Sequence, residues 1–242
     1  MIEHIEQGTL PAHVKACIAL TSWKKRINTV GLTIYNLFET CGPDYHIVLT
    51  LAEEEFPKKE QELPRDLLLM NKTGVFEILW VKKNRQAFKK WLYCSLRYPS
   101  MPIVTADDDC LYLVNYADMM YSVWKRNKTC IVTLGKGANG NKELNMEPWP
   151  TGSKSLYPPY CFKNLWVSLV DKICDKTNDD DTFYAFFINH VFHYRIISPF
   201  TDDERNVYVF HDCIDALSSN KKKYGQHQAM QVILDAIKGM HI

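Results

Sequence analysis

Short apolar runs alternate with amphipathic stretches along the first half of the chain. The composition and length of these runs are those of strands buried on both faces of a sheet. They occupy residues 14–20, 45–51, 75–81 and 102–106. Between them apolar residues recur at helical spacing, and strand–helix alternation of this kind is typical of right-handed crossovers in a parallel sheet. We therefore predict an α/β fold with a Rossmann-type, mostly parallel sheet flanked by helices.

The same patterns predict where the helices lie. The first helix carries Ile27, Val30 and Ile34 on one face and is closed by Cys41-Gly42-Pro43, a helix stop. Further helices are expected near residues 58–70, 88–98, 115–127 and 165–174, with another strand at 129–134. No internal repeat or low-complexity tract interrupts this order, and 242 residues suit one large α/β domain or two small ones.

Three consecutive carboxylates, Asp107, Asp108 and Asp109, follow the strand at residues 102–106. Ligands of open α/β sheets bind at the carboxyl ends of the strands. Hard oxygen ligands at that place suit Mg²⁺ or Mn²⁺, which in turn suit a substrate diphosphate. The alternative is a solvated acidic turn, or the start of the next helix with Asp109 as its N-cap. Taken alone, the triplet leaves both interpretations open.

Hydroxyl, aromatic and basic side chains follow the first predicted strand, in the order Thr21-Ser22-Trp23-Lys24-Lys25-Arg26. Because this segment lies at a strand's carboxyl end and opens a helix, it could hold a nucleotide base and phosphate. A polar loop with Trp23 packed over the sheet edge is the alternative, and without further context it is the favoured one.

The second half of the chain has two unusual segments. Glycine and proline accumulate at residues 135–159, and a loop of this length is functional or mobile in most compact domains, so we interpret it as a substrate wall or lid. Asp179, Asp180 and Asp181 then begin a helix of aromatic and aliphatic residues. An N-cap that also complements the helix dipole explains one of these carboxylates well and three poorly.

Composition narrows the class of protein. The net charge is only +1, so nothing indicates a nucleic-acid partner. The eight scattered cysteines have no zinc-binding spacing, which indicates reduced, buried thiols. We see neither a signal peptide nor an apolar run long enough to span a membrane. We expect a cytoplasmic protein, at most peripheral to the inner face of the membrane.

Six short motifs in a fixed order resemble a family of sugar-nucleotide-dependent glycosyltransferases with the GT-A fold, which includes many bacterial polysaccharide enzymes. The motifs are T-S-W-K-K-R-I (21–27), E-E-F-P (54–57), F-K-K-W (88–91), I-V-T-A-D-D-D (103–109), L-Y-P-P (156–159) and D-D-T-F (180–183). The resemblance covers residues 14–195. It implies one glycosyltransferase domain over residues 1–242, with a nucleotide-sugar half at about 14–110 and an acceptor-side half at about 111–242.

The resemblance also implies roles for individual residues. Asp107 and Asp109 match the ends of a DXD motif, which holds the donor diphosphate through Mn²⁺ or Mg²⁺, and Asp180 and Asp181 match an acidic pair that provides the acceptor-side base, with Asp181 favoured. Donor or nucleotide binding is implied for Thr21, Trp23, Arg26, Asn84, Lys90, Asp107 and Asp108, and acceptor contacts for Gly152, Leu156 and Tyr157. The sequence departs from the family pattern at residues 153–155 and at Tyr160, which puts the acceptor's identity in doubt.

The expected reaction moves a sugar from a nucleotide sugar, with a UDP-sugar favoured, to a saccharide or lipid-linked saccharide, with inversion. It needs stabilisation of the leaving diphosphate and a base for the acceptor hydroxyl. His211 or His227 could complete the metal shell, although a core or surface histidine is the simpler interpretation of each. The alternatives are a metal-dependent phosphohydrolase or nucleotidyltransferase, and an inactive sugar-nucleotide-binding module.

Overall fold

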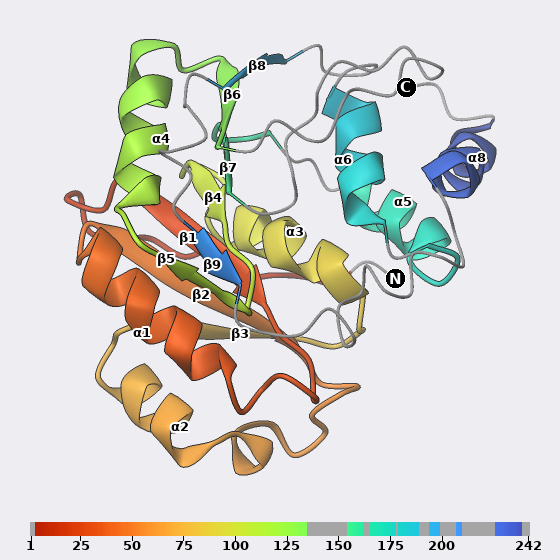
Figure 1. Cartoon of the computed structure of the whole chain (residues 1–242). Helices are drawn as coiled ribbons and strands as arrows, with labels where there is room; N and C mark the ends of the chain where they lie inside the picture. Colours follow the sequence, from red (N-terminus) through yellow and green to blue (C-terminus); the bar gives the residue numbers. More distant parts are fainter. Residues whose placement is uncertain are drawn as a thin grey trace.

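The computed structural model describes residues 3–134, 154–161, 165–177, 179–188, 194–198, 207–209 and 226–238. Within these residues a central sheet has the strand order β3-β2-β1-β4-β7-β6-β8 (Figure 1). The strands are β1 (Ala16–Thr21), β2 (Tyr45–Ala52), β3 (Glu77–Val81), β4 (Ile103–Thr105), β6 (Cys130–Thr133), β7 (Ser155–Tyr157) and β8 (Arg195–Ile197). Strands β1 to β4 are parallel, and β7 runs antiparallel to both β4 and β6. The predicted mostly parallel sheet is thus confirmed.

Helices cover both faces of this sheet (Figure 1). They are α1 (Val30–Cys41), α2 (Arg65–Lys72), α3 (Lys89–Arg97), α4 (Tyr116–Arg126), α5 (Leu165–Ile173), α6 (Asp180–Phe187) and α8 (Gln226–Ile237), with two 3₁₀ turns, η1 (Lys59–Glu62) and η2 (Gln86–Phe88). Successive side chains of a strand point to opposite faces. Cys17 and Ala19 of β1 accordingly join the core under α3, α5, α6 and α8, whereas Ile18 and Leu20 join the core under α1, α2 and α4.

Two elements differ from the prediction, each for a local reason. The helix expected at residues 58–70 is divided into η1 and α2, because Leu63 precedes Pro64 and takes an extended conformation, with ψ of 148°. No helix begins at Asp109. The chain instead forms β5 (Cys110–Tyr112), which pairs antiparallel with β9 (Val207–Val209), and α4 begins later with Asn115 as its cap. The N-cap interpretation of Asp109 is therefore wrong.

Among the described helices, none combines the length and the apolar character that a membrane crossing requires. Seven of the eight cysteines lie in the described part of the chain, and all seven are buried, as the sequence predicts.

Candidate active site

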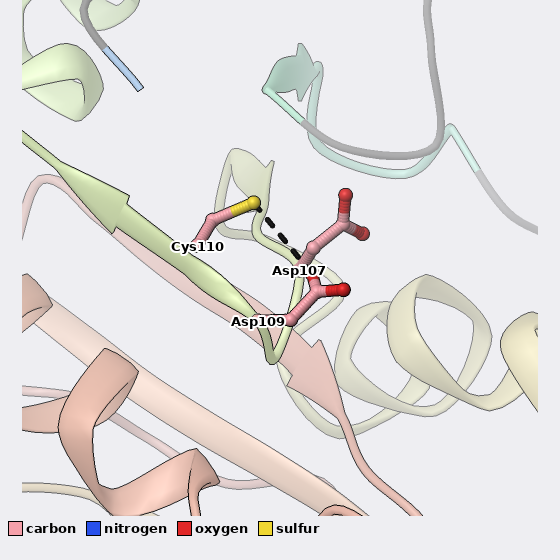
Figure 2. A group of neighbouring side chains, drawn as sticks. All are labelled: Asp107, Asp109 and Cys110. Atoms are coloured by element: carbon pink, nitrogen blue, oxygen red, sulfur yellow. Dashed lines mark hydrogen bonds between the residues drawn. The ribbon is translucent and has the colours of Figure 1, made fainter. Parts of the chain in front are cut away.

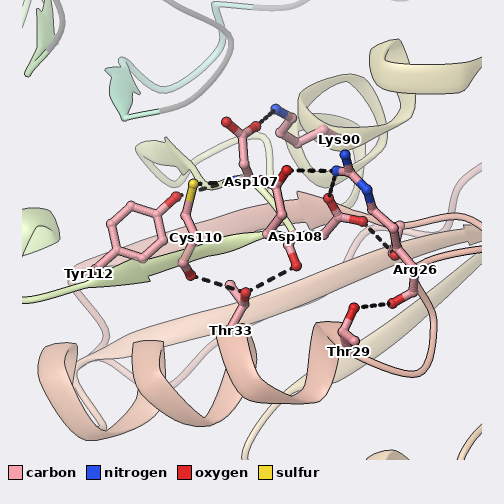
Figure 3. Close-up of polar contacts among 10 residues, drawn as sticks. Arg26, Thr29, Thr33, Lys90, Asp107, Asp108, Cys110 and Tyr112 are labelled. Atoms are coloured by element: carbon pink, nitrogen blue, oxygen red, sulfur yellow. Dashed lines mark hydrogen bonds and ion pairs between the residues drawn. The ribbon is translucent and has the colours of Figure 1, made fainter. Parts of the chain in front are cut away.

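The Asp triplet lies in the turn between β4 and β5, at the carboxyl edge of the parallel strands (Figure 3). The turn is held from beneath by Tyr112, whose hydroxyl accepts a hydrogen bond of 2.9 Å from the backbone N–H of Asp107. Tyr112 is fully buried and stacks on Tyr116, with ring centroids 4.2 Å apart. The position of Asp107 is thus set by rigid aromatic packing.

Asp108 points into the protein. Its Oδ2 accepts a hydrogen bond of 2.6 Å from the Ser22 hydroxyl, and its Oδ1 accepts one of 2.9 Å from Nη1 of Arg26. The Thr33 hydroxyl lies within hydrogen-bonding distance of two backbone carbonyls, those of Asp108 and Cys110. Burial raises the pKa of Asp108, although Ser22 and Arg26 favour its ionised form. Asp108 therefore fastens the turn to α1 and to the segment after β1.

Arg26 pairs with two members of the triplet. Its Nη1 lies 2.9 Å from Oδ1 of Asp108 and 2.9 Å from Oδ2 of Asp109, and the residue is only 8% exposed. Burial opposes the charged guanidinium, but Asp108 and Asp109 outweigh it and raise the pKa of Arg26. A single buried guanidinium thus offsets the repulsion between two neighbouring carboxylates.

Lys90 of α3 pairs with the third member. Its ammonium lies 2.7 Å from Oδ1 of Asp107 and its side chain is 8% exposed. Burial disfavours this charge, yet the pKa of Lys90 is raised because Asp107, Asp180 and Asp181 outweigh the burial. The carboxylates that act on Lys90 come from both acidic segments of the sequence. The fold therefore places the two segments around one buried cation.

The three carboxylates of the second acidic segment, at residues 179–181, have different surroundings. Asp179 caps α6: its Oδ1 accepts from the backbone N–H of Thr182 at 3.1 Å, and its Oδ2 accepts from the Thr182 hydroxyl at 2.8 Å. Asp180 and Asp181 follow as the first residues of the helix, with Asp180 buried and Asp181 half-buried. The N-cap interpretation thus holds for Asp179, and the two carboxylates that act on Lys90 follow it in the first turn of the helix.

Asp107, Asp109 and Cys110 together present two carboxylates and a thiol whose ligand atoms lie within 4.8 Å of one another (Figure 2). Carboxylate oxygens suit Mn²⁺ or Mg²⁺. The Cys110 thiol donates a hydrogen bond of 3.7 Å to Asp109 Oδ1, and burial raises its pKa, so it is a protonated neighbour of the carboxylates. The donor set therefore fits a divalent cation held by Asp107 and Asp109, since Asp108 points inward.

Three other residues that were predicted to bind the nucleotide-sugar donor lie nearby, each in contact with another residue of the protein. The Thr21 hydroxyl donates to the carbonyl of Thr50 at 2.7 Å, and the ring of Trp23 lies 5.2 Å from the Lys25 ammonium. Asn84 Oδ1 accepts from the ammonium of Lys89 at 2.8 Å. Thr21 ends β1, Trp23 follows β1, and Asn84 follows β3. All three therefore lie along the edge of the sheet that carries the triplet.

The predicted acceptor residues lie differently. Leu156 and Tyr157 belong to β7 and are 0% and 1% exposed, and the Tyr157 ring stacks on Trp91 with centroids 3.8 Å apart. In this conformation neither side chain has surface to offer an acceptor, because both are enclosed by the core. Gly152, His211 and the side chain of His227 lie outside the described residues.

Sequence reasoning did not single out several residues that build this site. Four such residues contact the triplet, some from as far as 86 positions away in the sequence: Ser22, Thr33, Cys110 and Tyr112. Ser22 stands within the T-S-W motif, so its place in the loop was a usable signal. Thr33 and Tyr112 resemble ordinary helix and strand residues, and nothing in their sequence context marks them.

No protein-family model matches the chain, and no curated protein matches its sequence. Among solved structures, the mannosyltransferase PcManGT from Pyrobaculum calidifontis, in complex with GDP-Man and Mn²⁺, is similar with a TM-score of 0.52 and 10% identity. The match covers 98% of this chain and 78% of that one. The apo structure of WbbM, a bifunctional glycosyltransferase, is similar with a TM-score of 0.45 and 9% identity, over 70% of this chain and 35% of that one. The chain thus has the α/β fold of a mannosyltransferase, in agreement with the predicted fold class.

Proposed function

We propose that this protein is a metal-dependent glycosyltransferase that moves a sugar from a nucleotide sugar to a saccharide or lipid-linked saccharide. The observation that carries the proposal is the meeting of two acidic segments, more than 70 positions apart, around the buried Lys90. Glycosyl transfer needs two charged centres in one site, one for the leaving diphosphate and one for the acceptor proton. A fold shared with a mannosyltransferase supports this assignment.

The donor side of the site is assigned to the triplet. Asp107 and Asp109 would hold Mn²⁺ or Mg²⁺, which as a Lewis acid neutralises the charge that grows on a leaving diphosphate. Lys90, already beside Asp107, supplies a second positive charge on that side, while Arg26 and Asp108 keep the turn in place. The similar mannosyltransferase has GDP-Man and Mn²⁺ bound, so GDP-sugars stand beside UDP-sugars as donors to test.

The acceptor side is assigned to the first turn of α6. Asp181 is half-buried, whereas Asp180 is buried, so Asp181 is the better placed to take a proton from an acceptor hydroxyl. If this carboxylate takes the proton from the acceptor hydroxyl, the acceptor oxygen attacks the anomeric carbon from the face opposite the diphosphate, the bond to the diphosphate breaks, and the anomeric configuration is inverted. We place the catalytic base at Asp181, with Asp180 as the alternative.

The experiment that tests the function is a donor panel. The melting temperature of the pure protein is measured with UDP-, GDP- and CMP-sugars, with and without Mn²⁺. Release of the nucleotide is measured in a separate assay with saccharide acceptors. Transfer with release of nucleoside diphosphate is the expected result. Release of UMP from a UDP-sugar or of GMP from a GDP-sugar would instead identify a phosphohydrolase or nucleotidyltransferase, whereas glycosyl transfer from a CMP-sugar itself releases CMP. Binding without any release from the whole panel would leave a sugar-nucleotide-binding module.

The metal assignment makes a separate prediction. UDP or GDP should raise the melting temperature clearly more with Mn²⁺ than with EDTA, because ligand binding to the folded state stabilises it. Asp109→Asn should abolish the Mn²⁺-dependent increment while leaving the apo protein folded, since Arg26 keeps its contact with Asp108. Asp66→Asn, on the distant helix α2, is the matched control. Equal nucleotide stabilisation with Mn²⁺ and with EDTA would refute the metal assignment.

A further inference from the structure

A second cleft opens at the edge of the sheet opposite the Asp triplet. It is lined by the residues that precede β1, β4, β6 and β8 and by those that follow β7. Because β4 is parallel to β1 and antiparallel to β7, all these ends meet at one edge, whereas the triplet follows the other end of β4. Tyr121 and Trp124 of helix α4 form the remaining wall. The cleft is thus separate from the proposed active site.

The volume of this open cleft falls in the range of ligand sites. It is about 570 Å³, and small-molecule sites typically have about 300–1,000 Å³. Tyr121, Trp124 and Tyr194 give it three aromatic rings. The first two pack together with centroids 5.6 Å apart, and Nε1 of Trp124 donates to the carbonyl of Lys128 at 3.1 Å. The aromatic wall is therefore fixed before any ligand arrives.

The polar groups of the lining select the ligand's chemistry. Four of the described lining residues can donate hydrogen bonds, namely Lys15, Lys128, Ser100 and Thr129, and none of the described lining residues has a carboxylate or amide side chain. Asp118 and Asp44 hold Lys15 at 2.8 Å and 3.1 Å, which leaves one of its three N–H groups for a ligand. Lys128 is exposed and forms no ion pair with the described residues. A ligand here therefore meets several hydrogen-bond donors and one exposed ammonium, that of Lys128, without an ion-pair partner among the described residues.

We propose that this cleft binds a saccharide segment that carries a carboxylate. Aromatic side chains offer flat apolar surface to the C–H faces of a sugar ring, while the hydroxyl and ammonium donors at the rim meet its oxygen atoms. The anionic group pairs with Lys128, whose charge is reinforced by Lys125 and Arg126 in the last turn of α4. A purely apolar ligand would leave these donors unused, and a neutral sugar would leave the charge of Lys128 unpaired. The site does not depend on transfer activity.

The test is isothermal titration calorimetry of the full chain with trigalacturonate, and with neutral mannotriose for comparison. Trigalacturonate should bind more tightly than mannotriose. Lys128→Ala should weaken its binding about two- to fivefold, as for an exposed ion pair, and Lys128→Glu about tenfold. Ser100→Trp, at an exposed position, should fill the cleft and abolish binding. Lys72→Ala, exposed in the last turn of α2 and outside the lining, is the matched control.

Binding that follows this variant pattern and persists with saturating GDP or UDP and Mn²⁺ supports the inference, whatever the donor panel shows. Three results would overturn it: no binding of trigalacturonate at millimolar concentration, binding that Lys128→Glu and Ser100→Trp leave unchanged, or displacement by the nucleotide. Equal or tighter binding of mannotriose would also refute it, because the cationic rim would then have no role. Far-UV circular dichroism confirms that each variant is folded.

Discussion

Arg26→Met should lower the free energy of unfolding by about 3–5 kcal/mol, the range measured when one partner of a buried ion pair is removed. The guanidinium of Arg26 is the charged partner of two carboxylates, and both Arg26 and Asp108 are less than a tenth exposed. Methionine fills similar space but leaves the Ser22 hydroxyl as the one described side chain that still donates a hydrogen bond to the Asp108 carboxylate. Urea denaturation at pH 7, extrapolated to water, measures the loss.

The stability that Arg26→Met loses should depend on pH in a definite direction. Burial already raises the pKa of Asp108, and the loss of Arg26 raises it further. A carboxyl group whose pKa is higher in the folded than in the unfolded state binds more protons when folded, so the stability of the variant falls as the pH rises. The deficit against the wild type should therefore be smaller at pH 4 than at pH 7.

The double variant Arg26→Met with Asp108→Asn is the control. Asparagine is neutral and can still accept a hydrogen bond from Ser22, so at least half of the lost stability should return. A loss below about 1 kcal/mol for Arg26→Met, or no recovery in the double variant, would mean that water solvates the triplet. Arg26 would then act as a surface cation, and contacts other than its ion pairs would have to hold the turn at residues 107–109 in position.

The elements of the fold that could be predicted are those whose own residues form a recognisable sequence pattern. The first four strands lie within two residues of their predicted bounds, because each is buried on both faces and reads as an unbroken apolar run. Strands β5, β7, β8 and β9 have three residues each, too few for a period, and they are held by partners far away in the sequence. The pairing of β5 with β9 joins positions almost a hundred residues apart.

The candidate site shows the same division. The place of the triplet at a strand's carboxyl end was predictable, but the inward turn of Asp108 was not, since it depends on Ser22, Arg26 and Thr33. The pair Lys89 and Lys90 has the sequence of a solvated basic cluster, yet both residues are buried. Successive helix positions are about 100° apart, so Lys89 reaches Glu55 while Lys90 reaches Asp107. Each lysine has its own carboxylate, which a pattern of charges alone does not reveal.

Asp181→Asn should lower the rate of sugar transfer by about 10²–10⁴-fold at saturating donor, the usual cost of a missing general base. Nucleotide affinity should stay near that of the wild type, because the donor is assigned to Asp107 and Asp109 on the other side of Lys90. Stability should barely change, since Asp179 and not Asp181 caps α6. Turnover, nucleotide affinity and melting temperature are measured on the same sample.

Asp179→Ala is the matched control on the same helix start, and it should show the opposite pattern. Losing both bonds to Thr182 should cost about 1 kcal/mol of stability, as for other N-caps, with little change in turnover per folded molecule. If turnover survives in Asp181→Asn but is lost in Asp180→Asn, the base is Asp180. If both asparagine variants keep full turnover, α6 contributes only its capped start beside Lys90, and the acceptor proton must leave through a group on another element.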